Sequence, residues 1–153
     1  MALRIGYPSL STCILPTAYC LLLTASLTAN DHALQGRTAW DGVYTDAQAE
    51  RGRASYQQAC VACHRDDLRG DNTAPSLVGE SFMFLWGDME VGELSARIQK
   101  VMPPERPGSL PAQTYIDIVT FILQKNGFPA GDAELGRDPA ALQILITSKR
   151  PER

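Results

Sequence analysis

The stretch Cys-Val-Ala-Cys-His, from Cys60 to His64, constrains this chain more than any other feature. The sequence of 153 residues holds only four cysteines and two histidines. The C-x-x-C-H order is the attachment pattern of a c-type haem. On a single helical turn, Cys60 and Cys63 can add to the two vinyl groups of one porphyrin, and the imidazole of His64 can then bind the iron from the same side. We therefore expect one covalently bound haem c with its iron.

Three other uses of these residues compete with haem attachment. A structural zinc site needs about four ligands, and His32 is the only other histidine. A thioredoxin-type redox pair calls for a βαβ context, which the sequence around Cys60 does not show. A disulfide between the two cysteines would leave His64 without a role. Haem attachment gives all three side chains a role and needs no further cysteine.

The N-terminal segment differs in composition from the rest of the chain. Within residues 1–29 the only charged side chain is Arg4, and a mostly apolar run covers about residues 13–27. This pattern predicts a signal peptide over residues 1–29, cleaved after Ala29 or alternatively at Ser26. A retained membrane anchor is the rival, although a spanning helix needs roughly 20 strongly apolar residues. We expect an exported, periplasmic protein that is bound to the membrane only if this segment stays uncleaved.

The charge of the chain bears on its partners. The formal net charge is −3, and removal of Arg4 with the signal peptide leaves 13 basic and 17 acidic residues, a charge of −4. A protein that binds a phosphate backbone needs a basic surface, so we exclude nucleic acid as a partner.

The first helical signal precedes the cysteines. Thr45 and Gln48 have the form of a capping box, with Thr45 as N-cap and Gln48 reaching back, and they predict a helix from about residue 46 to residue 58. A loop rich in Asp, Gly, Asn and Pro is expected over residues 65–80.

Two more helices are expected further along the chain. The second covers about residues 91–101, and the third begins near Pro111 and is stopped by Gly127. Its apolar residues repeat with helical spacing: Tyr115, Ile118, Val119 and Ile122. The tail after Gly127 should wrap the domain and not form a second one. We expect an all-α fold of three to five short helices packed around the haem.

A haem iron that only exchanges electrons needs a second axial ligand. The candidates are Met83, Met89, Met102 and His32. Met102 is favoured because it follows the second helix and precedes two prolines, which stiffen the loop. Met83 lies in the apolar segment SFMFLW and should pack in the core, Met89 lies beside acidic residues, and His32 lies near the expected mature N-terminus. Ligation by His64 and Met102 fills both axial sites and raises the reduction potential relative to two nitrogen ligands.

Three further residues are expected around the haem. A metal-bound histidine usually donates its other N–H to a carbonyl, and Pro75 offers one in a loop that cannot become helical. Leu77 would then pack on the porphyrin ring. The indole of Trp86 either hydrogen-bonds a haem propionate or is an ordinary packing residue.

The segments GVYTDAQAERGRASYQQACVACH, APSLVGESF, MPPERPGSL and YIDIVTFILQKNGFPAG resemble the class I c-type cytochromes, which are small periplasmic electron carriers with one haem. The resemblance runs from about residue 40 to residue 131. It implies the class I cytochrome c fold, with Met102 as distal ligand and Pro75 as acceptor for the histidine. It also implies that a helix with Gly52 and Tyr56 crosses a C-terminal helix at Phe121.

This resemblance sets the expected domains. Residues 30–153 are read as a cytochrome c domain with a core of about 44–128 and an extension of about 132–153. The extension is not part of the minimal fold. Pro111 stands where relatives often carry a Ser-type helix cap.

The expected function is that of a periplasmic electron carrier and not of an enzyme. Its partners would be redox proteins: a periplasmic dehydrogenase as donor and an oxidase or another cytochrome as acceptor, with no small-molecule substrate. Some of the segments look most like cytochromes that partner dehydrogenases, including quinoprotein dehydrogenases. A dedicated cytochrome subunit of such a complex is therefore one alternative. A ligand-binding or enzymatic haem protein with an open sixth coordination site is the other.

Overall fold

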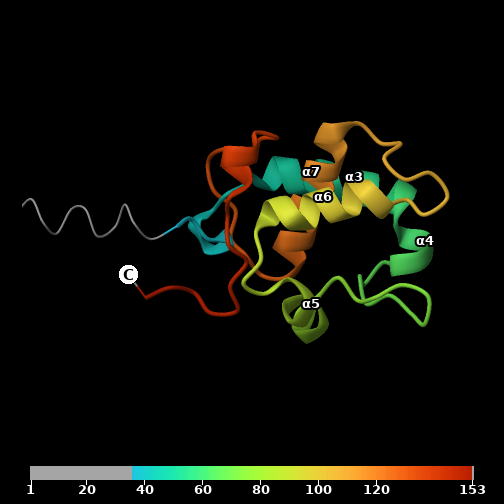
Figure 1. Ribbon diagram of the computed structural model, residues 1–153, viewed down its shortest axis with the longest axis horizontal. Coiled ribbons are helices and arrows are strands. Elements are labelled where there is room, and N and C mark those ends of the chain that lie inside the picture. The colour runs from blue at the N-terminus through green and yellow to red at the C-terminus, as the bar shows by residue number, and fades with distance from the viewer. Residues whose placement is uncertain (1–35, 153) are drawn as a thin grey trace, which may run out of the picture. The chain divides into compact units, whose positions relative to one another are not determined.

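The computed structural model describes residues 36–152 (Figure 1). The predicted signal peptide, residues 1–29, and His32 lie outside the described residues. The described part has helices, short 3-10 turns and isolated β-bridges but no strand, which confirms the expected all-α fold. Its five α-helices are α3 (Asp46–Ala59), α4 (Val61–His64), α5 (Gly79–Trp86), α6 (Val91–Val101) and α7 (Ala112–Lys125).

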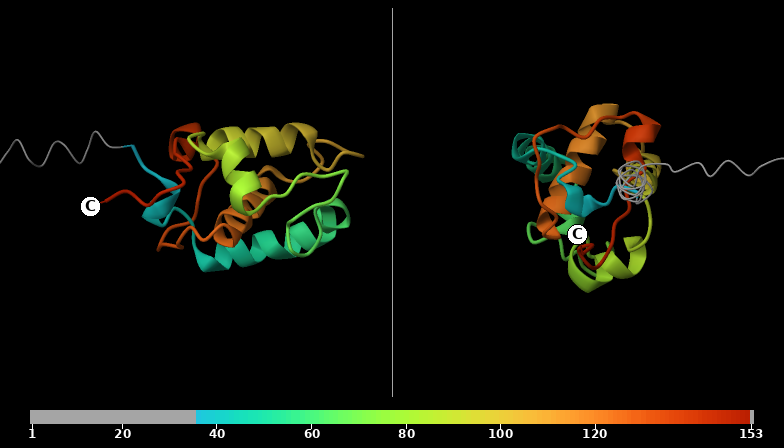
Figure 2. Two further views of the ribbon diagram at one scale, coloured as in Figure 1. Left: turned by 90° about the horizontal axis from the view of Figure 1, so that it is seen from below. Right: turned by 90° about the vertical axis from the view of Figure 1, so that its left-hand side faces the viewer.

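Helix α7 is the centre of the helical frame. It packs against both α3 and α6, which lie on opposite sides of it (Figure 2). Its middle positions are buried on every side, Asp117 and Thr120 among them. A helix that is apolar around most of its circumference belongs inside the core, and α7 takes that place here.

The crossing of α3 and α7 depends on a glycine. A Cβ atom added to Gly52 would lie 1.8 Å from the backbone oxygen of Asp117, so only glycine allows the two helices to approach this closely. One turn further along α3, the ring of Tyr56 lies 5.3 Å from the ring of Phe121 on α7, at a tilt of 56°. The crossing implied by the family resemblance is therefore present.

The predicted helix boundaries agree with the structure to about one residue. The Thr45 side chain caps α3 by accepting a hydrogen bond from the backbone N–H of Gln48 at 3.1 Å. Pro111 immediately precedes α7, and Gly127 follows it with a φ of +85°. Helix α5 was not expected as a helix.

The expected return contact of Gln48 in the capping box is wrong. Its side-chain amide donates to Asp117 at 3.1 Å and to the backbone oxygen of Leu135 at 2.9 Å, and it accepts from the Leu135 N–H at 2.8 Å. The side chain is fully buried. Gln48 therefore fastens the C-terminal extension to the helical frame and does not cap its own helix.

The tail wraps the domain, as expected. After the 3-10 helix η2 (Pro139–Leu142), the side chains of Ile144 and Ile146 are both fully buried. The backbone oxygen of Ile144 accepts from Val91 N–H at 2.8 Å, and the N–H of Ile146 donates to the oxygen of Met89 at 2.9 Å. The tail thus closes over the start of α6. None of the helices among residues 36–152 has the length and apolar character to cross a membrane.

Candidate functional site

The two cysteines and the histidine share one turn of helix. Cys60 precedes α4, and its backbone oxygen accepts from the N–H of Cys63 at 3.2 Å and from that of His64 at 3.0 Å. Both thiols are free and partly buried. The three side chains are therefore brought together as expected, with no bond between the sulfurs.

The imidazole of His64 is buried, and only one of its two ring nitrogens has a hydrogen-bond partner among the described residues. The side chain is 6 % exposed, and its Nδ1 lies 3.0 Å from the backbone oxygen of Pro75. Since a carbonyl oxygen only accepts, Nδ1 carries a proton, and in the neutral imidazole Nε2 then keeps its lone pair. Among the described residues Nε2 has no hydrogen-bond partner. No side-chain nitrogen of these residues is both fully buried and unpaired, so Nε2 is not fully buried. Nε2 is therefore open to a ligand, which is what an iron-binding histidine requires.

The loop that carries Pro75 is held by several contacts of its own. The N–H of Gly70 donates to the backbone oxygen of His64 at 3.1 Å, and the N–H of Leu77 donates to that of Leu68 at 2.7 Å. The side chain of Asn126, at the end of α7, donates to the oxygen of Leu77 at 2.9 Å. The Leu77 side chain packs against the core. The acceptor for the histidine is thus fixed from both sides.

Met102 directly follows another helix, α6. It forms the C-cap of α6, its N–H donates to the oxygen of Ile98 at 2.8 Å, and its side chain is partly buried. Its backbone oxygen accepts from the hydroxyl of Tyr115 at 2.8 Å. Of the other candidates, Met83 packs against the core and Met89 is tied to the C-terminal tail through its backbone oxygen.

Trp86 ends helix α5 and is partly buried against the core. Its indole N–H makes no hydrogen bond within residues 36–152. Since no side-chain nitrogen of the described residues is both fully buried and unpaired, this N–H is accessible from outside. It could therefore donate to an oxygen of a bound group, as the propionate hypothesis requires.

The electrostatic environment of Cys60 does not favour redox exchange. Burial, with a smaller contribution from the neighbouring Cys63, raises the pKa of Cys60 to about 11. Thiol–disulfide exchange is carried out by thiolates whose pKa is lowered by a positive environment. Cys60 instead stays protonated near neutral pH, unlike the attacking cysteine of a thioredoxin-type pair.

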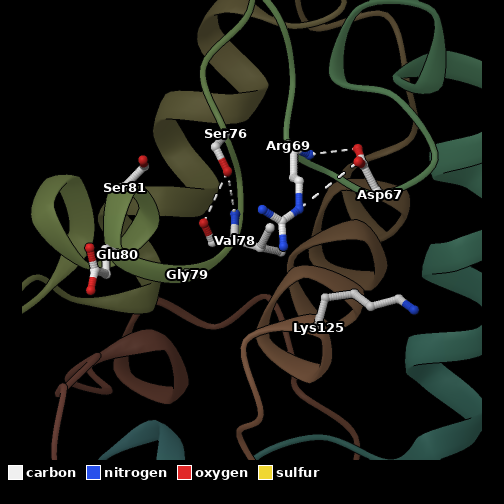
Figure 3. Close-up of a pocket in the computed structure, with 8 residues that line it drawn as sticks. All are labelled: Asp67, Arg69, Ser76, Val78, Gly79, Glu80, Ser81 and Lys125. Carbon is white, nitrogen blue, oxygen red and sulfur yellow. Dashed lines mark hydrogen bonds and ion pairs between the residues drawn. The ribbon is translucent and has the colours of Figure 1, made fainter.

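A cavity of about 820 Å³ opens elsewhere on the surface, between the 65–78 loop and the first turn of α5 (Figure 3). Most of its lining is polar, and Arg69 faces Asp67 there while Ser76 is bonded to Val78. None of the predicted haem residues lines it. This cavity is therefore separate from the candidate haem site.

The side chains present fit a covalently bound haem. Two free thiols and an imidazole with an open nitrogen lie on one helical turn, and Met102 offers a soft sulfur at the end of α6. Thioether and imidazole suit iron as ligands. Cys60 and Cys63 would hold the porphyrin, and His64 and Met102 would hold the iron.

Sequence reasoning missed the polar atoms that position these segments. The pattern predicts only a packing role for Tyr56, but its hydroxyl donates to the backbone oxygen of Arg65 at 2.7 Å, directly after the histidine. The helical spacing predicts Tyr115 only as part of an apolar stripe, and nothing in the sequence pattern indicates the contacts of Asn126. The available signal was general: a buried tyrosine hydroxyl needs a hydrogen-bond partner.

Comparison with known families agrees with this chemistry. Residues 47–122, about half of the chain, match the family model described as cytochrome C oxidase, cbb3-type, subunit III. No curated protein and no solved structure matched. The matched stretch begins in the first turn of α3 and ends in α7, so it includes the cysteines, His64 and Met102. Through residues 47–122 the chain belongs to the cytochrome c family, as a class I domain that carries covalently bound haem c with its iron.

Proposed function

We propose that this protein carries single electrons on one haem c, attached at Cys60 and Cys63, with His64 and Met102 as the axial ligands of the iron. The observation that carries the proposal is the half-satisfied imidazole, with Nδ1 bonded to Pro75 and Nε2 free, on the same helical turn as two free thiols. The cytochrome c domain supports haem-based electron transfer with protein partners and favours a carrier over an enzyme.

Each proposed ligand has a defined task. The hydrogen bond to Pro75 fixes the tautomer of His64, keeps its ring from rotating and raises the basicity of Nε2. The thioether of Met102 would bind the iron on the side opposite His64 and would thereby exclude substrates and external ligands. Leu77 and Trp86 form the proposed surroundings, and Trp86 contributes a free N–H. The bound haem supplies the one-electron chemistry, and the protein supplies its position and potential.

The proposal extends to location and partners. The predicted signal peptide supports export to the periplasm, with the cytochrome c domain over residues 30–153. A periplasmic dehydrogenase is the proposed donor, and an oxidase or another cytochrome is the proposed acceptor. The net negative charge favours a partner with a basic docking face. Interfaces of such transient redox pairs bury less than about 1,200 Å².

The test is a comparison of methionine variants made in cells that attach haem. Wild-type protein should be coloured, with a methionine-to-iron charge-transfer band when oxidised. Met102→Leu should keep the covalent haem, lose this band, lower the reduction potential and bind carbon monoxide when reduced. Met83→Leu and Met89→Leu are the matched controls and should keep the band. A colourless wild-type protein would refute haem attachment, and a Met102→Leu protein with an unchanged band would refute the ligand assignment.

The cysteines and the histidine are tested by the yield of coloured protein. Cys60→Ser, Cys63→Ser and His64→Ala should each leave little folded holoprotein, because they remove a bond to the porphyrin or to the iron. Gels stained for covalent haem measure this directly. Full haem attachment in His64→Ala would show that another residue binds the iron.

A further inference from the structure

We infer that Tyr115 is the positioning residue for Met102: its hydroxyl ties together the two ends of the segment 102–110 and thereby holds the methionine in place. This inference rests on the proposed function, since it concerns the proposed distal ligand. It assigns a task to a side chain that neither the haem pattern nor the family match identifies.

The hydroxyl of Tyr115 lies between two backbone atoms, one from each end of the segment 102–110. Tyr115 lies in the first turn of α7 and is 1 % exposed. Its hydroxyl donates to the backbone oxygen of Met102 at 2.8 Å and accepts from the backbone N–H of Leu110 at 3.3 Å. A hydroxyl has one proton and two lone pairs, so both bonds form at once. The start and the end of the segment are therefore fastened to the same atom of α7.

The rest of the segment offers little that could replace this atom. Residues 104–109 are all exposed. The three internal backbone bonds are those of turns: Arg106 N–H to the oxygen of Pro103 at 2.9 Å, Gly108 N–H to that of Met102 at 3.3 Å and Ser109 N–H to that of Arg106 at 3.2 Å. Among the described residues, Tyr115 has the only side chain that hydrogen-bonds the backbone of segment 102–110.

The consequence concerns how easily Met102 moves away. Displacing the methionine requires the end of α6 and the loop behind it to shift, and both hydrogen bonds of the phenol oppose that shift. A buried hydrogen bond of ordinary strength changes such an equilibrium by about tenfold when it is lost. Removing the hydroxyl should therefore favour displacement by about that factor while leaving the ring packed.

The experiment uses the holoprotein with Tyr115→Phe and imidazole as the competing ligand. The variant keeps the aromatic ring, so circular dichroism and covalent haem content should match the wild type. The apparent affinity of the oxidised protein for imidazole should rise about tenfold. The backbone amide of Leu110 should also exchange with solvent faster, because it has lost its acceptor.

Tyr44→Phe is the matched control. Tyr44 is fully buried, and its hydroxyl donates to the backbone oxygen of Phe128 at 2.6 Å. The control therefore loses a comparable hydrogen bond outside segment 102–110. It should leave the imidazole affinity unchanged, which separates loop positioning from general destabilisation.

Two negative results have different meanings. If Met102→Leu raises imidazole affinity strongly but Tyr115→Phe matches Tyr44→Phe, the positioning role is wrong and the proposed function stands. If Met102→Leu itself leaves the imidazole affinity unchanged, Met102 is not the ligand and both the assignment and this inference fail.

Discussion

The segments that carry His64 and Met102 are anchored in different ways. The His64 segment is held mainly by contacts of its own: its imidazole bonds to Pro75, its backbone oxygen accepts from Gly70, and Leu68 behind it is 1 % exposed. Two side chains from outside, those of Tyr56 and Asn126, add hydrogen bonds to it. The Met102 segment is exposed over residues 104–109, and the only side chain that bonds its described backbone is Tyr115 of another helix.

We read the difference as a division of tasks between the two proposed axial sites. On the His64 side, contacts within the segment fix the imidazole and its loop, and Asn126 at the end of α7 adds one hydrogen bond. On the Met102 side, the side-chain hydrogen bonds to the backbone come from Tyr115 alone among the described residues, so they exist only once α7 has docked. We therefore expect haem still to be attached when a substitution releases the methionine. We do not expect the methionine to stay in place when a substitution prevents haem attachment.

The largest expected effect comes from disturbing the crossing of α3 and α7, which supports both segments. Gly52→Ala places a Cβ 1.8 Å from the backbone oxygen of Asp117 and should force α3 and α7 apart. Helix propensity alone would make alanine stabilising by about 1 kcal/mol, but the overlap should cost about 3 kcal/mol or more. Thermal unfolding of purified holoprotein measures the balance. Gly136→Ala, where nothing lies within 4 Å of the added atom, is the control.

Ile146→Ala should destabilise the whole domain and should not affect the His64 segment more than the Met102 segment. Its side chain is fully buried, and truncation of such an isoleucine costs about 2–5 kcal/mol. Denaturant unfolding should show this loss, and the oxidised spectrum should not change. Leu145→Ala is the matched control because its side chain is 39 % exposed and should cost under about 1 kcal/mol. A changed charge-transfer band in Ile146→Ala would mean that the tail also supports the methionine.

Tyr56→Phe tests whether the His64 segment keeps its position when its hydrogen bond from α3 is lost. The hydroxyl donates to the oxygen of Arg65 at 2.7 Å, so its loss should cost about 1 kcal/mol of folding free energy. Because other bonds hold this segment, imidazole affinity should stay at the wild-type value, in contrast with Tyr115→Phe. Equal increases in the two variants would remove the asymmetry between the segments.

The smallest effect is an acid-induced loosening confined to the His64 loop. Hydrogen bonds from Thr73 lower the pKa of the exposed Asp71 below its ordinary value of 3.8. The stabilisation is therefore present above that ordinary value and is lost as the pH falls through the lowered pKa. The amide of Thr73 should lose its acceptor over that range, while that of Gly108 should not respond. Proton chemical shifts at varied pH report this, and Asp71→Asn should abolish the dependence.

The sequence predicts the parts of this molecule that are locally encoded. Thr45, Pro111 and Gly127 mark helix ends by their own backbone or side-chain chemistry, and the boundaries follow from them. Helix α5 was missed because its run SFMFLW has no amphipathic period and its N-cap, Val78, has no capping side chain. Phe82, in the middle of α5, is fully buried in the core.

Long-range polar contacts account for the rest. Gln48 looks like a capping residue in its local sequence, but its partners are 69 and 87 positions away. In the same way, the apolar pattern identifies the ring of Tyr115 but says nothing of the backbone atoms that its hydroxyl meets. The residues proposed to hold haem could be named from the sequence, and so could the Pro75 carbonyl beside His64. The hydroxyls of Tyr56 and Tyr115 and the amide of Asn126 could not be assigned their partners in this way.

The pairing of the tail with the start of the domain has a consequence for protein engineering. The backbone N–H of Leu145 donates to the backbone oxygen of Arg37 at 2.9 Å, and its backbone oxygen accepts from the N–H of Ala39 at 2.8 Å. The first and last parts of the described residues 36–152 therefore lie side by side. Units built in this way tolerate circular permutation and insertion into a host protein. Short linkers at these two positions would therefore graft a redox module into the surface loop of an unrelated scaffold.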